Sequence, residues 1–286
     1  MSNPYIKDYQ HKRVHMIGIG GSSMSGLARM LHEKGYTLTG SDNLETYTTK
    51  GLRALGIPVV IGHHAQNVQD ADMIIYTVAV SADNAERVEA ERLNIPAIER
   101  AVLLGQLMDD SATAIGVCGT HGKTTTTSMI AQVLMATDTD PSIHIGGNLE
   151  LIGGNVRTGK GDIFLTEACE FNLSFMHLKP DVAVITNIDE DHLDFFCDID
   201  HIQASFHRFL SLVPQGGTVI GNRDDPRVMS ILQTLSCQTL TYGMSDTSDV
   251  YASRISYNEL GQGSFDLVHH GQVLGCVALK VAGDFN

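Results

Sequence analysis

The chain has 286 residues, of which 43% are hydrophobic, and its 19 Lys and Arg against 33 Asp and Glu give a formal net charge of -14. This length fits two globular domains better than one. The negative charge repels nucleic acids and anionic membrane surfaces, so we expect neither as a partner. It does not exclude a nucleotide, because backbone N–H groups and bound cations can hold phosphates in an acidic protein.

Cysteine usage and hydrophobic run lengths indicate the compartment. The five cysteines are scattered and lack CxxC spacing, so neither a disulfide framework nor a zinc site is indicated. No stretch approaches the roughly 20 apolar residues that cross a bilayer. We therefore expect a cytoplasmic protein.

The first hundred residues alternate between strand-like and helix-like patterns. Residues 13–21 form an apolar run that ends in a glycine cluster, residues 23–35 have a helical pattern, and residues 36–42 are again strand-like. Three more strand-like runs follow, at residues 58–64, 72–80 and 95–100. Stretches that can cross back as helix or loop precede these runs, so a parallel sheet is expected.

A second strand-loop-helix unit begins after the helix-like residues 101–108. We therefore predict one domain over residues 1–108 and another over residues 109–286. In the second domain, residues 162–168 and 181–189 are apolar runs that end in acidic or amide residues, as in buried parallel strands that carry a ligand site at their carboxyl ends. Alternating stretches after Pro226 predict a small antiparallel appendage. The fold class is α/β.

The segment from Gly119 to Thr125, GTHGKTT, lies between a predicted strand and a predicted helix. Its glycines let backbone N–H groups approach phosphate oxygens, and the helix N-terminus adds a favourable dipole. Lys123 can neutralise β- and γ-phosphate charge, and the Thr124 hydroxyl can bind Mg²⁺. The strict GxxxxGK[ST] spacing requires glycine at Val117, so this is a shortened relative of that motif. Nucleotide binding is favoured over a simple glycine-rich turn.

Polar residues at the ends of the next two predicted strands can complete a metal site. Glu167 ends one strand, and Asp189, Asp191 and His192 follow the other. Mg²⁺ prefers oxygen ligands, which Glu167 and Thr124 can supply beside phosphate oxygens. From the residues alone, His192 fits either a ligand or a hydrogen-bonding residue at a strand end.

A second glycine cluster near the N-terminus imitates a dinucleotide-binding fingerprint. Gly18, Gly20 and Gly21 follow a strand and precede a helix, and Asp42 ends the next strand. The GxGxxG pattern requires glycine at Ser23, so the match is imperfect. The same geometry suits any diphosphate, including that of a UDP-sugar, or close packing without a ligand.

Together these segments resemble the Mur ligases of peptidoglycan synthesis. The resemblance spans nearly the whole chain and rests on GIGGSSMSGLA (residues 18–28), GSD (40–42), GTHGKTTTTSMIA (119–131), IGGNL (145–149), EACEFNLSF (167–175), TNIDEDHLDFF (186–196) and NRDDP (222–226). It implies a Rossmann-like UDP-sugar domain, a P-loop-type ATP domain and a C-terminal domain for the incoming amino acid. The chain ends with GDFN where the family motif resembles GxHN, so the third domain is expected to be absent.

The resemblance also implies roles for matching positions. The closest branch joins L-alanine to UDP-N-acetylmuramate with ATP and Mg²⁺, through an acyl phosphate and without an enzyme nucleophile. Lys123, Glu167 and His192 would be catalytic, with Thr124, Glu167 and His192 at the metal. The implied ATP contacts are Gly119, Thr120, Gly122, Lys123, Thr124, Thr125 and Asn222. The implied sugar-substrate contacts are Gly18, Gly20, Gly21, Ser22, Asp42, His121 and Asn148.

One departure and three alternatives accompany this interpretation. Cys169 stands where many relatives have an acidic residue, but Glu167 and Glu170 remain. A murein-peptide ligase would act on the same sugar with a different acceptor. An NAD-dependent oxidoreductase leaves the GTHGKTT segment unexplained, and a nucleotide-binding scaffold would keep the loop without turnover.

Overall fold

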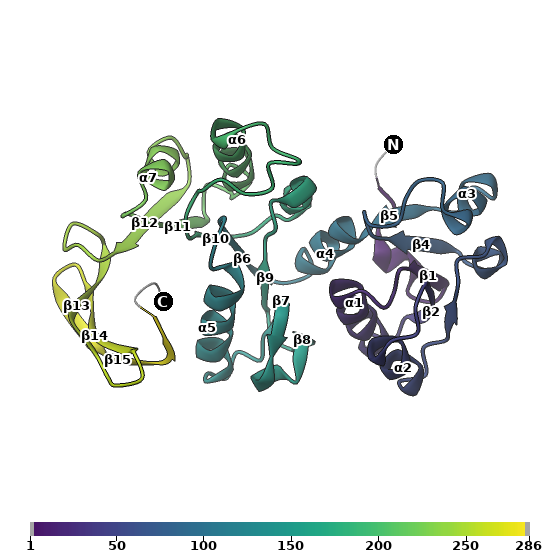
Figure 1. Ribbon diagram of the computed structural model, residues 1–286, viewed down its shortest axis with the longest axis horizontal. Helices are drawn as coiled ribbons and strands as arrows, with labels where there is room; N and C mark the ends of the chain where they lie inside the picture. The colour runs from purple at the N-terminus through teal and green to yellow at the C-terminus, as the bar shows by residue number, and fades with distance from the viewer. Residues whose placement is uncertain (1–2, 284–286) are drawn as a thin grey trace. The chain divides into compact units, whose positions relative to one another are not determined.

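A computed structural model describes residues 3–283 of the chain, which divides into two compact units. The first unit comprises Met1–Ala112 with Leu134–Phe164, and the second comprises Thr113–Val133 with Leu165–Asn286. Both are α/β, as the sequence predicted, and the colour ramp of Figure 1 follows the chain through them.

The first unit contains a parallel sheet with strand order β3-β2-β1-β4-β5. Its strands are β1 (Arg13–Ile17), β2 (Thr37–Asp42), β3 (Val59–Ile61), β4 (Met73–Tyr76) and β5 (Ala97–Glu99). Its helices are α1 (Ser22–Glu33), α2 (Tyr47–Ala54), α3 (Ala85–Arg92) and α4 (Arg100–Met108). The strand order reverses direction at β1, so the carboxyl end of β1 is a topological switch point, where α/β sheets bind ligands.

An antiparallel strand pair that the sequence did not predict also belongs to the first unit. It consists of β7 (Ser142–Leu149) and β8 (Gly154–Arg157). The register is irregular between His144 and Leu149, and neither strand shows a clean alternation of buried and exposed residues. A periodicity of two is therefore absent from this part of the sequence.

Eight neighbouring strands of a mixed sheet lie in the second unit, in the order β15-β14-β13-β12-β11-β10-β6-β9. Its strands up to the appendage are β6 (Thr113–Cys118), β9 (Ile163–Glu167), β10 (Val182–Ile185), β11 (Thr218–Asn222) and β12 (Gln238–Gly243), and its helices are α5 (Lys123–Met135), α6 (Ile199–Leu210) and α7 (Pro226–Leu232). The rings of Phe175 and Phe209 stack at 4.6 Å in the core. Strand β10 pairs in parallel with both β6 and β11, which brings the carboxyl ends of these strands to one edge.

The predicted antiparallel appendage is confirmed. It consists of β13 (Val250–Tyr257), β14 (Gln262–His269) and β15 (Gln272–Ala282), joined in antiparallel pairs. In Figure 1 these strands lie at the yellow end of the chain.

Short 3-10 helices occupy several connections, at Ile6–Tyr9, Ala65–Val68, Glu150–Ile152 and Phe171–His177. The last of these follows β9 and contains a break, because Asn172 and Leu173 both have φ of 53°. In the described part of the chain, no helix has both the length and the apolar character needed to cross a membrane.

Candidate functional site

The loop between β6 and α5 owes its path to two glycines with left-handed backbone geometry. Gly119 has φ of 127° and Gly122 has φ of 81°. A Cβ on Gly119 would lie 2.1 Å from Oγ1 of Thr186, so the loop can pass β10 closely only with glycine here. The GTHGKTT segment therefore forms a tight strand-to-helix loop at the carboxyl edge of the sheet.

Asn187 fixes this loop from the end of β10. Its backbone oxygen accepts from N of Thr120 at 3.0 Å, and its side chain both accepts from N of His121 at 2.8 Å and donates to O of His121 at 3.0 Å. Sequence reasoning did not single out Asn187, although an amide after a buried strand in the TNIDEDH stretch is the signal that could have found it. The asparagine holds the first half of the loop.

The second half of the loop has unused backbone donors. At the start of α5, the first backbone hydrogen bond between residues four apart runs from N of Thr126 to O of Gly122 at 2.9 Å. Within residues 3–283, no partner is described for the backbone N–H groups of Gly122, Lys123, Thr124 and Thr125. Free N–H groups at a helix N-terminus form a site for an anion such as phosphate.

Lys123 uses all three of its N–H donors within the protein. Its Nζ donates to the backbone oxygens of Gly119 and Thr120 at 2.7 and 2.9 Å. A third bond of 3.0 Å reaches Oε1 of Glu170. The side chain of Lys123 is 16% exposed and that of Glu170 is 3% exposed, so this ion pair is largely shielded from water.

Thr124 and Glu167 lie together, as the sequence predicted for neighbouring strand ends. Oγ1 of Thr124 donates to Oε2 of Glu167 at 3.1 Å, although they are 43 positions apart in the sequence. A hydroxyl and a carboxylate at this distance are a suitable pair of oxygen ligands for Mg²⁺.

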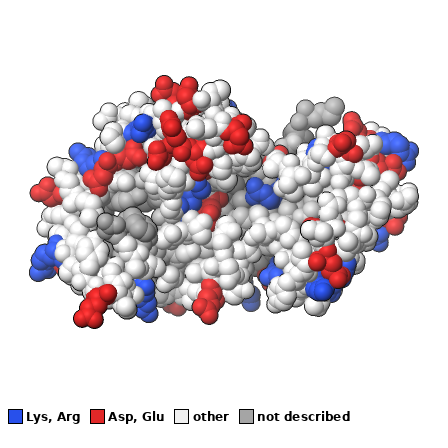
Figure 2. All heavy atoms as spheres, in the orientation of Figure 1, with Lys and Arg blue, Asp and Glu red and all other residues white. Residues whose placement is uncertain are grey.

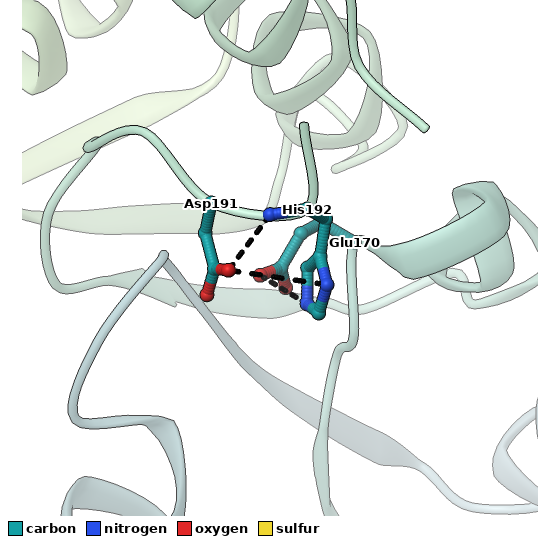
Figure 3. A group of neighbouring side chains, drawn as sticks. All are labelled: Glu170, Asp191 and His192. Atoms are coloured by element: carbon teal, nitrogen blue, oxygen red, sulfur yellow. Dashed lines mark hydrogen bonds and ion pairs between the residues drawn. The ribbon is translucent and has the colours of Figure 1, made fainter. Parts of the chain in front are cut away.

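His192 lies beside Glu170 and Asp191, as Figure 3 shows. Nε2 of His192 is 3.9 Å from Oε1 of Glu170, and one ligand atom from each of the three residues falls within 4.8 Å of the others. His192 has φ of 50°, and its ring contacts that of Phe171 at 5.0 Å. Backbone strain of this kind persists only where the surrounding structure holds it, often at functional sites. The group offers one nitrogen and two carboxylate ligands for a cation.

Asn222 lines a cavity of about 520 Å³ in the second unit. Its wall includes Asn187 and Tyr242, together with apolar side chains of β13 and β14 such as Ile255 and Phe265. Burial is the main cause that raises the pKa of Tyr242 to about 12, so its hydroxyl stays neutral. A mostly apolar cavity with amide groups at its rim suits a flat heteroaromatic ring.

His121 and Asn148 were also predicted as site residues. Nε2 of His121 is 3.6 Å from Oδ2 of Asp189, and both side chains are mostly exposed, so this pair adds little stability. Asn148 is exposed near the end of β7 in the first unit.

Two cysteines lie next to site residues in the sequence, and they differ in burial. Cys118 is fully buried at the end of β6, and desolvation raises the pKa of its thiol far above the ordinary value. Cys169 is exposed, next to the short helix that begins at Phe171.

The glycine loop of the first unit is held from the end of β2. The backbone oxygen of Ser41 accepts from N of Gly18 and N of Ile19 at 2.9 and 3.0 Å. Oδ2 of Asp42 accepts from N of Gly20 at 2.8 Å, and N of Gly21 donates to O of Gly18. These N–H groups already have acceptors on β2 or in the loop itself, so the glycines contribute to the shape of the loop.

The backbone donors left at this end of the unit belong to α1. At the start of α1, the first backbone hydrogen bond between residues four apart runs from N of Ser25 to O of Gly21 at 2.8 Å. For the backbone N–H groups of Ser22, Ser23 and Met24, the described residues include no partner. An anion at this loop would therefore meet the first turn of α1.

A buried carboxylate lies beneath the ends of β2 and β3. Glu86, on α3, has no exposed surface and accepts from Ser41, His63 and Asn67 at 2.6, 2.8 and 2.5 Å. Burial raises the pKa of Glu86, but hydrogen bonds from His15, Ser41 and Asn67 outweigh this and hold the pKa below its ordinary value. The network connects strands β1, β2 and β3 behind the glycine loop.

Acidic side chains cover much of the surface near α6 and α7, as the red spheres in Figure 2 show. Asp194, Asp198 and Asp200 are among the exposed carboxylates there. Such a surface repels polyanions. Phosphate binding therefore depends on local donors such as Lys123 and the α5 N-terminus.

The chain matches two family descriptions. Residues 13–112 match "Mur ligase family, catalytic domain", and residues 117–286 match "Mur ligase middle domain". Together the matches cover most of the chain and both glycine loops.

Curated relatives carry a common name. The chain is 45% identical over all its 286 residues to UDP-N-acetylmuramate--L-alanine ligase of Clostridium perfringens, and 44% identical over 281 residues to the protein of the same name from Alkaliphilus metalliredigens. It covers 62% and 61% of these relatives, so it spans less than two thirds of their length.

Solved structures of similar fold belong to the same group of enzymes. UDP-N-acetylmuramate:L-alanyl-gamma-D-glutamyl-meso-diaminopimelate ligase from Neisseria meningitides matches with a TM-score of 0.84 and 30% identity over 96% of this chain and 89% of that one. UDP-N-acetylmuramate-alanine ligase from Thermotoga maritima matches with a TM-score of 0.82 and 28% identity over 96% of this chain and 62% of that one.

Proposed function

The chain belongs to the Mur ligase family, and from this we propose that it forms the nucleotide- and UDP-sugar-binding part of an ATP-dependent ligase that joins L-alanine to UDP-N-acetylmuramate. The observation that carries the proposal is the loop from Gly119 to Thr125. It combines free helix N-terminal donors, a shielded lysine and a Thr124–Glu167 pair at one sheet edge. These are the groups that phosphoryl transfer from ATP requires.

The nucleotide would lie along this edge. Its phosphates would meet the backbone N–H groups of Gly122 to Thr125, and Lys123 would face the γ-phosphate. Support for the adenine position comes from Asn222 and the mostly apolar cavity of about 520 Å³ that it lines. Gly119 and Thr120 would keep the loop closely packed beside the phosphates.

The substrate carboxylate would be activated by phosphorylation. A carboxylate does not condense with an amine unaided at neutral pH, because its oxygen is a poor leaving group. The lactyl carboxylate of the sugar would attack the γ-phosphate of ATP, forming an acyl phosphate and releasing ADP. The amine of L-alanine would then attack the acyl carbon, releasing phosphate and leaving an amide. Lys123 would stabilise the charge that develops on the transferred group.

A magnesium ion fits the donor set at this edge. Thr124 and Glu167 supply two hard oxygen ligands 3.1 Å apart, and Nε2 of His192 lies 3.9 Å from Oε1 of Glu170, whose other carboxylate oxygen has no hydrogen-bond partner among the described residues. When bound, Mg²⁺ neutralises phosphate charge and polarises the phosphorus–oxygen bond. Glu167, Thr124 and His192 would hold it.

The UDP-sugar would bind to the first unit at the switch point after β1. The loop formed by Gly18, Gly20 and Gly21 is held in shape by Ser41 and Asp42. The diphosphate would accept hydrogen bonds from the free N–H groups at the start of α1, including that of Ser22. His121 and Asn148 would contact the muramoyl group.

Direct titration tests this proposal. Calorimetry on the 286-residue chain should show binding of ATP with Mg²⁺ and, separately, of UDP-N-acetylmuramate, without binding of NAD. Incubation of both ligands with hydroxylamine should trap an acyl hydroxamate if an acyl phosphate forms. Tight NAD binding without affinity for the UDP-sugar would contradict the proposal. The acceptor is tested by phosphate release with L-alanine against release with the tripeptide that murein-peptide ligases use.

A further inference from the structure

Glu170 has an unusual position for a carboxylate near a phosphate loop. It is 2% exposed, its Oε1 accepts from Lys123 at 3.0 Å, and its Oε2 is buried without a hydrogen-bond partner among the described residues. A buried carboxylate is strongly disfavoured unless its charge is compensated. Lys123 is the cation that compensates it in this structure.

Binding of a nucleotide disturbs this arrangement. The three donors of Lys123 are already used by Gly119, Thr120 and Glu170, so a hydrogen bond to the γ-phosphate requires Lys123 to release one partner. A phosphate oxygen at the usual distance of about 2.8 Å from Nζ would lie within about 6 Å of Oε1 of Glu170. Two anions would then share one ammonium group in a partly dry site.

A cation beside Glu170 removes this conflict. The unpartnered Oε2 offers a free oxygen ligand, and one carboxylate oxygen of Glu170 lies within 4.8 Å of ligand atoms of His192 and Asp191. The divalent ion that His192 helps to hold in the proposed function would also compensate the charge of Glu170 when Lys123 turns to the phosphate.

We propose that Glu170 exchanges Lys123 for a divalent cation when the nucleotide binds, and thereby makes nucleotide affinity depend on that cation. The inference rests on the proposed function, because it assumes that ATP binds at this loop. It assigns Glu170 a positioning role: the residue holds Lys123 and releases it only when another positive charge is present. A metal-free nucleotide therefore binds weakly to the wild-type chain.

The test compares Glu170→Gln with the wild-type chain in titrations with a non-hydrolysable ATP analogue, in EDTA and in excess Mg²⁺. Glutamine keeps the size of the side chain and removes its charge. We expect Glu170→Gln to bind the metal-free analogue at least about fivefold more tightly than wild type and to gain less from Mg²⁺, since coupling between two ligands usually amounts to about 5- to 150-fold. Glu259→Gln, the same change at an exposed position, should match wild type in both buffers.

The contrary result is equally specific. If Glu170 only braces Lys123, Glu170→Gln will bind the metal-free analogue no better than wild type, and the exchange is then wrong. The proposed function would survive that result, because the wild-type chain would still bind the analogue. If neither wild type nor any variant binds the ATP analogue in either buffer, the proposed function is contradicted, and the exchange with it.

A second variant provides a test that needs no nucleotide. Lys123→Met leaves Glu170 without its cation, so Mg²⁺ should raise the melting temperature of this variant more than that of wild type. The double variant Lys123→Met with Glu170→Gln should lose the additional increase. Equal effects of Mg²⁺ on wild type and Lys123→Met would overturn the exchange.

Discussion

At the scale of single residues, buried carboxylates do different work in the two units. Glu86 accepts hydrogen bonds from Ser41, His63 and Asn67 and keeps strand ends together, whereas Glu170 has one oxygen bound to Lys123 and one unpartnered. A buried carboxylate whose two oxygens both have hydrogen-bond partners contributes to a rigid structure. A buried carboxylate with one unpartnered oxygen can still bind a ligand. Both carboxylates are buried, so the number of their hydrogen-bond partners, more than their burial, distinguishes the structural role of Glu86 from the ligand-related role of Glu170.

Glu86 should make stability depend on acid pH. Its pKa is lowered in the folded state, so its stabilisation is fully present above the ordinary pKa of 4.5 and is lost as the pH falls through the lower folded value. Glu86→Gln should lower the free energy of unfolding at pH 7 by about 3 kcal/mol, because it replaces a charged acceptor of several buried donors. Between pH 5 and pH 3 the variant should lose less further stability than wild type.

Urea unfolding followed by circular dichroism at several pH values measures this effect. Glu91→Gln makes the same chemical change on the exposed side of α3 and should follow wild type at every pH. Parallel pH curves for Glu86→Gln and wild type would show that folding leaves the pKa of Glu86 unchanged, and would contradict this prediction.

At the scale of elements, both glycine loops get their shape from the neighbouring strand end. Asn187 after β10 holds the loop that enters α5, and Ser41 and Asp42 on β2 hold the loop that enters α1. In each loop, bonds to the neighbouring strand end engage the early N–H groups and leave those at the start of the helix free. A strand–loop–helix element therefore aims its donors at one point before any ligand arrives.

Gly119→Ala tests how much this geometry matters. A Cβ here would lie 2.1 Å from Oγ1 of Thr186 on a backbone with φ of 127°, so the loop must move. We expect ATP affinity to fall by at least about tenfold and the melting temperature to fall by several degrees, from about 1–3 kcal/mol of strain. Gly216→Ala, where added volume meets no atom within 4 Å, should leave ATP binding unchanged. Equal ATP affinities of the Gly119 and Gly216 variants would contradict the inferred geometry.

At the scale of the whole chain, local motifs predicted the elements better than the contacts between them. Alternating apolar runs predicted the parallel strands, and the GKT sequence predicted the loop at Lys123. Both predictions were possible because each signal lies in one continuous stretch of sequence. The bond between Thr124 and Glu167 followed from parallel strands that end at one edge. Burial of Glu170 and the bond from Asn187 could not be predicted, since both depend on packing after β9 and β10. The β7–β8 pair was missed because its register is irregular.

We propose that each unit binds one ligand. A substitution in one unit should therefore weaken the binding of that unit's ligand alone. Asp42→Ala removes the acceptor for N of Gly20 and should weaken UDP-N-acetylmuramate binding by about tenfold, because a loop donor is set free and the loop loses its shape. Lys123→Ala should weaken ATP binding by about a hundredfold, because a charge-assisted contact to phosphate is lost. In binary titrations, each variant should keep the wild-type affinity for the other ligand, since effects at distant independent sites are additive. Calorimetry of both variants with both ligands measures the four effects. Loss of ATP binding in Asp42→Ala would place the nucleotide at the first loop and contradict the assignment.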